Sequence, residues 1–375
     1  MLFKKGLEKV KPYQPGKPIE EVKRALGLKE VYKLASNEIP FPPVYIRKAV
    51  LDEIKNINRY PESGCFYLRQ ELAERLKVKE SQIVFGNGSD EIITLILRAT
   101  IGSEKDEVII AYPTFLMYEI QARVERARVV VVPLKSLRYD LEAIAKKVNQ
   151  KTRLIFIANP DNPTGTYVNQ KEVEEFLKKI PKDVLVYFDE AYFEFAPSDF
   201  PRTKHFLKKR GNIIIGRTFS KIYGLAGVRL GYCVTTEKIA DMLNKIRDPF
   251  NINRFAQIAA LAALKNDKFF KKTLSYVKKE KEYLYKELNK ADISFIKSAT
   301  NFILIKFGKN NSKLCDYLLQ NGIIVRNLSS WGLADFFRIS IGLRKENRKF
   351  IDCLKKYLRT PVCRHKGREI HDCRL

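Results

Sequence analysis

Six short apolar runs recur between residues 83 and 215, and longer segments with helical spacing of apolar residues separate them. The runs are Ile83–Phe85, Val108–Ala111, Val129–Val132, Leu154–Ala158, Val184–Phe188 and Ile213–Ile215. Parallel strands need a crossover between them, and a helix usually supplies it. This alternation therefore predicts an α/β fold with a largely parallel, doubly wound sheet between about residues 48 and 250.

After Pro249 the pattern changes. Two helices are indicated first, one buried (256–264) and one long and amphipathic (271–289). Strand candidates follow at 301–307, 323–326 and 337–341, with a helix around 314–320. This order predicts a smaller α+β domain with a mixed sheet. We therefore expect an N-terminal arm (1–34), a large domain (35–250), a small domain (251–360) and a tail (361–375).

The chain is strongly basic, with 70 Lys and Arg against 43 Asp and Glu, a formal net charge of +27. A nucleic-acid site would concentrate this charge in a patch or stripe. Here it is spread from end to end, and Glu280 interrupts the main cluster at 278–281. We therefore predict no nucleic-acid partner, and a positive field that attracts small anions.

Nothing in the sequence suggests export or membrane insertion. Charged residues begin at Lys4, so a secretory signal is not expected, and no apolar run approaches the roughly 18 residues that a membrane span needs. The six cysteines are sparse, which fits free thiols in a reducing compartment. They are Cys65, Cys233, Cys315, Cys353, Cys363 and Cys373. These features predict a cytoplasmic protein with no membrane partner.

The tail holds four soft ligands, Cys363, His365, His371 and Cys373. Their one-residue spacings are shorter than those usual in zinc sites. We therefore predict no metal site.

Four polar segments follow strand candidates. Residues 86–91 combine a glycine turn with a helix start, where free backbone N–H groups can bind phosphate. Residues 159–165, Asn-Pro-Asp-Asn-Pro-Thr-Gly, form a rigid loop at a strand end, where ligands bind in open α/β sheets. Each segment alone is also compatible with an ordinary turn.

Two further segments bring charge to the same sheet edge. Asp189 ends a buried strand and needs a cationic partner, since an unpaired buried carboxylate is costly. A metal-binding or purely structural Asp fits that position too. Lys221 lies among small residues, and Arg229 follows eight residues later. A lysine and an arginine so placed suit a cofactor that carries an aldehyde and a phosphate.

Taken together and in this order, the segments resemble the fold-type I aminotransferases, which depend on pyridoxal 5'-phosphate. The resemblance spans nearly all of residues 5–358. It implies a large domain with a mostly parallel seven-stranded sheet flanked by helices, plus a smaller α+β C-terminal domain.

The resemblance also implies roles for individual residues. Lys221 corresponds to the Schiff-base lysine that also moves protons, and Asp189 to the partner of the pyridinium nitrogen. Tyr192 and Asn162 would contact the phenolic oxygen of the cofactor, and Phe115 would stack on its ring. The residues implied at the cofactor phosphate are Ser89, Asp90, Thr218, Ser220 and Arg229. Tyr60 would reach that phosphate from the neighbouring subunit, which implies a homodimer.

Segments outside this core most resemble the histidinol-phosphate aminotransferases. They are Pro12–Pro18, Lys33–Glu38, Gly322–Arg326, Trp331–Leu333 and Phe337–Gly342. The resemblance implies substrate contacts by Tyr13, Asn37, Arg326 and Arg338. A guanidinium fork suits such an enzyme, because it accepts either a carboxylate or a phosphate. Arg338 adjoins apolar residues, so we expect it to have an anionic partner.

The implied reaction transfers an amino group between L-histidinol phosphate and 2-oxoglutarate, giving imidazole acetol phosphate and L-glutamate, in histidine biosynthesis. Two alternatives keep the same core, an aromatic-amino-acid aminotransferase and a threonine-phosphate decarboxylase. A DNA-binding regulator on this fold would need an added helix-turn-helix domain, and residues 1–34 are too short and proline-rich for one. One departure is Ile39, where relatives often have Asn, and we expect it to alter the pocket rim.

Overall fold

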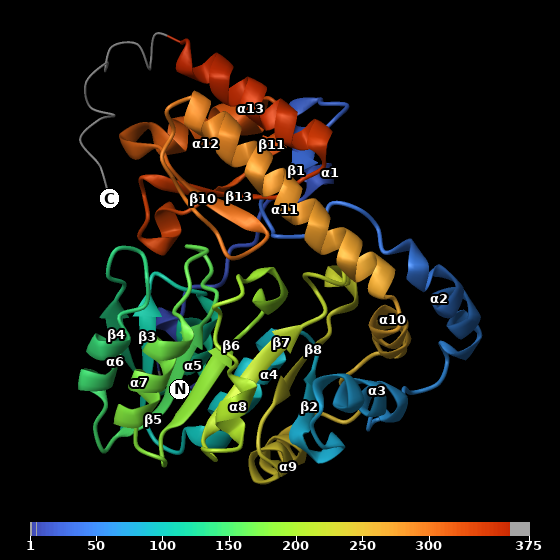
Figure 1. Cartoon of the computed structure of the whole chain (residues 1–375), viewed down its shortest axis with the longest axis vertical. Helices are drawn as coiled ribbons and strands as arrows, with labels where there is room; N and C mark the ends of the chain where they lie inside the picture. The colour runs from blue at the N-terminus through green and yellow to red at the C-terminus, as the bar shows by residue number, and fades with distance from the viewer. Residues whose placement is uncertain (1, 5, 361–375) are drawn as a thin grey trace.

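The computed structural model describes residues 2–4 and 6–360, and two layered domains are evident in it (Figure 1). The tail ligands Cys363, His365, His371 and Cys373 therefore lie outside the described residues. The large domain contains a seven-stranded sheet in the order β2-β8-β7-β6-β5-β3-β4. Its strands are β2 (Ile83–Gly86), β3 (Glu107–Tyr112), β4 (Arg128–Pro133), β5 (Thr152–Ala158), β6 (Leu185–Asp189), β7 (Ile213–Thr218) and β8 (Gly231–Val234).

All six strands predicted from apolar runs are present in this sheet. β3, β4, β5, β6 and β7 pair in parallel, whereas β8 runs antiparallel to both β7 and β2. The predicted doubly wound, mostly parallel fold is confirmed. β8 was not predicted, because its four residues follow the glycine-rich stretch 224–231 without a long apolar run.

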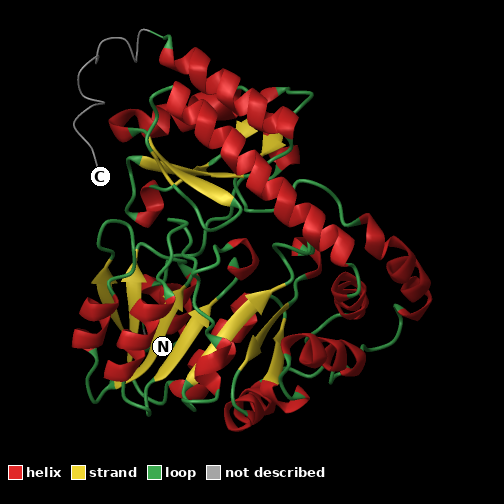
Figure 2. Ribbon diagram, viewed as in Figure 1, coloured by secondary structure: helices red, strands yellow, loops and turns green. Residues whose placement is uncertain are grey.

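Helices flank both faces of the sheet (Figure 2). They are α4 (Ser89–Thr100), α5 (Met117–Val124), α6 (Leu141–Lys147), α7 (Gln170–Lys179), α8 (Lys204–Leu207) and α9 (Glu237–Ile246). α4 contacts α5 and α9, while α6 contacts α7. The central strands β5 and β6 are buried except for one partly exposed residue near the start of each, as expected for a parallel sheet covered on both sides. Polar groups at the carboxyl ends of β5, β6 and β7 are thereby fixed at one edge.

The small domain is built around a second sheet in the order β12-β13-β10-β9. Its strands are β9 (Phe295–Ile296), β10 (Phe302–Lys306), β12 (Arg326–Asn327) and β13 (Phe336–Ser340), and α11 (Asp267–Lys290), α12 (Asn311–Gln320) and α13 (Arg344–Leu358) accompany it. Every pairing in this sheet is antiparallel. The expectation of a mixed sheet was wrong, because β11 (Ile323–Ile324) instead pairs in parallel with β1 (Tyr32–Lys33) outside it.

Segments distant in sequence join the two domains. α1 (Ile19–Leu26) and β1 pack on the small domain, where Val22, Val31 and Ala35 form a cluster with Ile324. α10 (Arg254–Leu264) instead packs against α2 (Arg47–Glu53) and α3 (Phe66–Leu76). The domain boundaries given above remain a prediction.

An apolar cluster lies where the domains meet. Leu304, Leu328, Trp331 and Leu333 of the small domain form it, and Phe115, Leu116 and Leu137 of the large domain pack against them. The cluster fixes the small domain over the carboxyl edge of the large sheet. None of the helices in the described part of the chain is long and apolar enough to cross a membrane.

Candidate active site

A cavity of about 310 Å³ lies between the carboxyl edge of the large sheet and the small domain. Every site residue predicted from the sequence lines it except Tyr60. These lining residues are Tyr13, Asn37, Ser89, Asp90, Phe115, Asn162, Asp189, Tyr192, Thr218, Ser220, Lys221, Arg229, Arg326 and Arg338. The fold therefore gathers segments separated by more than 300 residues into one site. Ile39 is not among the lining residues and packs against the main core instead, so it does not form the rim.

Tyr60 lies away from the cavity of its own chain. Its side chain is 79% exposed and stacks on Phe250 with 4.7 Å between ring centroids. Within one chain the structure does not bring it to the site.

Asp189 is buried at the end of β6, on the floor of the cavity. One carboxylate oxygen accepts a hydrogen bond from the Tyr118 hydroxyl at 2.7 Å, and the other accepts one from the Ala191 N–H at 3.0 Å. Burial raises the pKa of Asp189 to about 6, and the two hydrogen bonds oppose that rise. The described residues give this carboxylate no ion-pair partner, so a cationic group in the cavity would complete it.

Tyr118 was not predicted from the sequence. It is fully buried at the start of α5, and its ring stacks on Phe156 with 4.7 Å between centroids. A tyrosine on the buried face of a helix, three residues after Phe115, was the available signal, because a buried hydroxyl usually needs a hydrogen-bond partner.

Lys221 follows β7 and is half-buried in the cavity wall. Loss of hydration, the larger cause, and the positive charge of Arg338 together lower the pKa of its amine to about 8. The Glu38 carboxylate opposes this effect. The Lys221 Nζ atom lies 5.6 Å from the centroid of the Tyr192 ring. An amine with this pKa is partly unprotonated near neutral pH and is therefore an available nucleophile and base.

One end of the cavity is suited to a phosphate. α4 begins after Gly88 with no side-chain cap, so the first N–H groups of the helix are free to bind an anion. Arg229 extends over this turn and pairs with Asp90 at 3.2 Å. Gly88 has φ +79°, and a Cβ atom there would lie 2.4 Å from Arg229 Nη2. Glycine is therefore required for the guanidinium to approach the helix start.

Thr218 and Ser220 line the same end. The Thr218 hydroxyl donates to the Leu230 carbonyl at 3.3 Å and accepts from the Ser220 N–H at 3.0 Å. These bonds fix the turn after β7, and they leave the Ser220 hydroxyl as a donor at the cavity wall.

At the other end, Arg338 projects from β13 and is only 5% exposed. Its Nη1 donates to the Asn162 side-chain oxygen, and its Nη2 donates to the Ala35 carbonyl at 2.8 Å. Its Nε is buried without a hydrogen-bond partner among the described residues. Burial lowers the pKa of Arg338 to about 10. A buried guanidinium with only neutral partners is costly, which favours an anion in the cavity.

Arg326 lies beside it and holds the N-terminal arm. Its Nη2 donates to the Gln14 carbonyl at 2.7 Å, and its guanidinium lies 5.6 Å from the Tyr13 ring centroid and 6.0 Å from that of Trp331. Trp331, whose role was not predicted, is buried and fixes the position of this cation.

Asn37 links the arm side of the cavity to the large domain. Its side-chain amide donates to the Tyr192 hydroxyl at 2.8 Å, and its backbone N–H donates to Ser340 Oγ at 2.7 Å. Burial raises the pKa of Tyr192 to about 12, so this phenol stays protonated and can donate a hydrogen bond.

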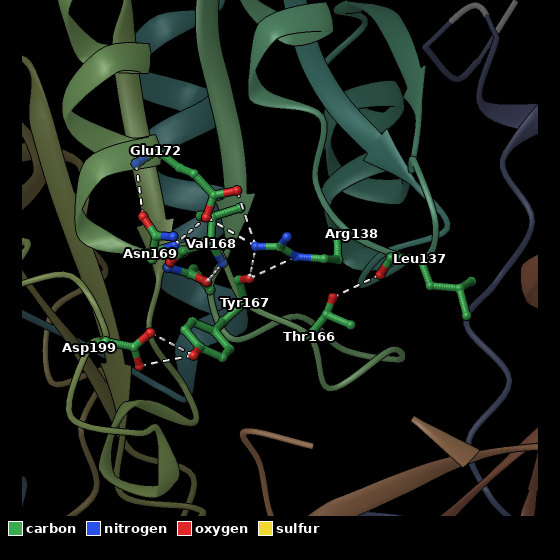
Figure 3. A network of polar contacts seen from close by, with 9 residues as sticks. Leu137, Arg138, Thr166, Tyr167, Val168, Asn169, Glu172 and Asp199 are labelled. Atoms are coloured by element: carbon green, nitrogen blue, oxygen red, sulfur yellow. Dashed lines mark hydrogen bonds and ion pairs between the residues drawn. The ribbon is translucent and has the colours of Figure 1, made fainter. Parts of the chain in front are cut away.

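A polar network holds the loop that carries Asn162 (Figure 3). Arg138 donates to the Tyr167 carbonyl at 3.0 Å and pairs with Glu172, and Thr166 Oγ1 donates to the Leu137 carbonyl at 2.8 Å. Within the loop, the buried Asp161, which was not predicted, accepts a hydrogen bond from Thr114 Oγ1 at 2.7 Å. This bond fixes the segment that carries Phe115 against the Asn162 loop.

The family model for class I and II aminotransferases matches residues 29–354, which is most of the chain. This chain belongs to the class I and II aminotransferase family. Among its relatives in this family, the "Histidinol-phosphate aminotransferase 2" of Carboxydothermus hydrogenoformans is 41% identical over 360 residues, covering 95% of this chain and 99% of the relative. The histidinol-phosphate aminotransferase of Moorella thermoacetica is 42% identical, covering 93% of this chain and 91% of the relative.

Solved aminotransferase structures agree with this placement. The histidinol-phosphate aminotransferase of Sinorhizobium meliloti, solved in complex with pyridoxal-5'-phosphate, superposes with a TM-score of 0.86 at 27% identity, covering 96% of this chain and 98% of that one. An L-threonine-O-3-phosphate decarboxylase from Porphyromonas gingivalis is 23% identical with a TM-score of 0.77, which shows a shared fold alone. The predicted family and fold are confirmed, and the relatives favour the histidinol-phosphate aminotransferases over the two alternatives.

Proposed function

We propose that this chain catalyses amino transfer between L-histidinol phosphate and 2-oxoglutarate, with pyridoxal 5'-phosphate as cofactor and the residues described above as its active site. The products are imidazole acetol phosphate and L-glutamate, in histidine biosynthesis. The observation that carries the proposal is Arg338, a buried guanidinium with neutral partners that faces the cavity of Lys221 and Asp189. Relatives about 40% identical over nearly the whole chain carry this name.

The residues present fit the cofactor at three separate points. Asp189, buried without an ion pair among the described residues, suits a protonated ring nitrogen. Lys221 has the lowered pKa that attachment to an aldehyde requires. The uncapped start of α4, with Arg229 over it, suits the phosphate. When bound, the cofactor supplies an electron sink for the substrate carbon, and Asp189 keeps that sink charged.

Lys221 performs the proton transfers in this proposal. Its amine would take the proton from the amino-bearing carbon of the substrate and deliver it to the former aldehyde carbon of the cofactor. Tyr192 and Asn162 would donate hydrogen bonds to the phenolic oxygen of the cofactor, and Asn37 holds the Tyr192 hydroxyl in place. Phe115 would cover one face of the cofactor ring.

Arg338 and Arg326, assisted by Tyr13, bind the anionic arm of each substrate. Histidinol phosphate has a phosphomonoester where glutamate has its α-carboxylate. A guanidinium presents parallel N–H donors to either group, so one pocket serves both half-reactions. The two donor bonds of Arg338 to Asn162 and Ala35 fix its orientation before substrate arrives.

We further propose a cytoplasmic homodimer in which Tyr60 reaches the cofactor phosphate of the partner subunit. Large apolar side chains are exposed along one stretch of this chain, which supports an interface there. They are Val44, Leu51, Ile54, Ile57, Tyr60, Phe66 and Tyr67. An exposed apolar patch of this kind is typical of a protein interface. Sedimentation equilibrium should show that the wild-type protein is a dimer and that Ile57→Lys shifts it to a monomer. A wild-type protein that sediments as a monomer would refute the dimer.

A half-reaction tests the proposed activity. The holoenzyme is mixed with histidinol phosphate and no keto acid, and the visible spectrum is recorded; phenylalanine and O-phosphothreonine are tested in parallel. We expect histidinol phosphate, at low concentration, to convert the yellow lysine-bound cofactor to pyridoxamine phosphate. Faster conversion by phenylalanine would indicate an aromatic aminotransferase. Reaction with O-phosphothreonine alone, with release of carbon dioxide, would indicate the decarboxylase.

A further inference from the structure

Glu38 is an acidic lining residue for which the proposed site has no role. Asp189 has Tyr118 and the Ala191 N–H as partners, and Asp90 pairs with Arg229. Glu38 lines the same cavity, and its charge acts on Lys221. Its Oε1 pairs with Lys33 Nζ at 2.9 Å, whereas its Oε2 forms no hydrogen bond or ion pair with any described residue.

The backbone at this position is tightly held. Asn37, the preceding residue, has φ +56°, a left-handed conformation that is uncommon for a side chain other than glycine. Its N–H donates to Ser340 Oγ at 2.7 Å, and its carbonyl accepts from the Asn301 side chain at 3.0 Å. Such strain persists only where surrounding contacts enforce it, and it is common at functional sites. Glu38 therefore extends from a fixed point of the cavity wall.

This wall carries opposite charges at its two ends. The Ala35 carbonyl accepts a hydrogen bond from Arg338, which is the proposed anion site, and Glu38, three residues later, lines the same cavity as Lys221. A substrate with its anionic arm at Arg338 and its amine at Lys221 has one arm left to place. In histidinol phosphate that arm is an imidazole, which has an N–H donor; in glutamate it is a carboxylate.

We propose that Glu38 is the specificity-determining residue that accepts a hydrogen bond from the substrate imidazole, and that Lys33 positions it and balances its charge so that the carboxylate arm of glutamate is tolerated. The inference rests on the proposed function and deepens it. A phenyl arm has no N–H for Glu38, so its binding would desolvate the carboxylate without compensation. The Lys33 side chain is 22% exposed, whereas the Glu38 side chain is 44% exposed and so is accessible to a substrate arm.

The test measures kcat/KM of each half-reaction separately in Glu38→Gln, Lys33→Met and the double variant. Glu38→Gln should lower kcat/KM for histidinol phosphate about 10- to 100-fold, the range for a hydrogen bond to a charged group. The same variant should raise kcat/KM for glutamate by up to about tenfold, because the unbalanced Lys33 attracts its carboxylate arm. Lys33→Met should lower glutamate about tenfold, because the unbalanced Glu38 repels it. The double variant should restore glutamate to near the wild-type value, which loss of a merely structural pair would not do.

The matched control is Glu20→Gln, which removes an exposed carboxylate paired with a lysine, Lys23, at 3.1 Å on α1. It should change neither half-reaction. An equal fall for both substrates in Glu38→Gln, or no rescue of glutamate in the double variant, would overturn the inference. Wild-type enzyme that does not react with histidinol phosphate would instead refute the proposed function, so the two failures are distinguishable.

Discussion

Arg229 and Arg338 lie at opposite ends of the cavity, and each is proposed to bind an anion, but their surroundings differ. Arg229 lies at the end proposed to bind the cofactor phosphate, with 46% of its side chain exposed, and it pairs with Asp90, a carboxylate with a similarly exposed side chain. Arg338 lies at the end proposed to bind the substrate anion, is 5% exposed, and has two neutral oxygens as partners. One cation is solvated and has a counter-ion in the protein, whereas the other is desolvated and forms no ion pair among the described residues.

This difference in solvation and charge pairing suggests different roles for the two arginines: Arg229 helps to hold a ligand, whereas Arg338 selects one by its charge. Arg229 already has a counter-ion and water, so an added phosphate replaces interactions that exist. Arg338 has given up hydration without gaining a charge partner, and an anionic substrate arm supplies what is missing. We infer that the cofactor phosphate gains modestly from Arg229 and more from the helix start, whereas the substrate anion depends strongly on Arg338.

The largest effect is expected at the substrate end. Arg338→Met should lower kcat/KM for both histidinol phosphate and glutamate by about 100- to 1000-fold, as expected for removing one partner of a desolvated charged contact. Stopped-flow half-reactions measure this. Cofactor affinity, measured by fluorescence titration of the apoprotein, should change less than threefold. Loss of cofactor binding in this variant would contradict the proposal that Arg338 acts on the substrate and not on the cofactor.

Substitution of Arg229 should have a smaller effect, and it should act on cofactor binding and not on substrate reactivity. Arg229→Gln should weaken cofactor binding by about tenfold, since a half-exposed charged contact contributes little beyond the free N–H groups of α4. With saturating cofactor, kcat/KM for histidinol phosphate should stay within about threefold of wild type. A larger loss of substrate reactivity than in Arg338→Met would reverse our ranking of the two arginines.

The same two variants should shift the titration of Lys221 unequally. The pKa of this amine is lowered to about 8, with Arg338 the larger charge contribution and Arg229 the smaller. The amine is protonated below that pKa and free above it, so its labelling in apoprotein by trinitrobenzenesulfonate should rise through pH 8. Removing a nearby cation raises the pKa, so the labelling curve should move to higher pH, further in Arg338→Met than in Arg229→Gln. Peptide mapping assigns the label, and equal curves in both variants would contradict the geometry.

The smallest expected difference between the two ends of the cavity is in how ligand binding responds to salt. Screening acts on exposed charges more than on buried ones. Raising KCl from about 0.05 to 0.5 M should weaken cofactor binding a few-fold, while the loss of kcat/KM caused by Arg338→Met stays constant within about twofold. A mutational loss at Arg338 that disappears in high salt would mean that this guanidinium is solvated.

Much of this site could be predicted from sequence because its chemistry sits in short local motifs. Asp189, Asn162 and Lys221 each end or follow a buried strand, and parallel strands bring their carboxyl ends to one edge. The six strands were visible for the same reason, as buried runs between helices. β8 was missed because it begins with a glycine at the end of the glycine-rich stretch 224–231 and has no long apolar run.

The remaining features depend on contacts distant in sequence. Tyr118 donates to a carboxylate 71 residues away, and Arg338 donates to a carbonyl 303 residues away. No local pattern encodes such pairs, because a helix or strand positions only its near neighbours. The position of Arg326 over the Tyr13 ring likewise follows only from the packed domains.

The most direct test of the account is a double-mutant cycle on one charge. The ratio of kcat/KM for histidinol phosphate to that for histidinol, which lacks the phosphate, is measured in wild type and in Arg338→Met. If the substrate anion supplies the missing partner of Arg338, the ratio should be large in wild type and fall at least about 30-fold in the variant. An unchanged ratio, with both substrates slowed equally, would contradict the claim that Arg338 recognises the phosphate.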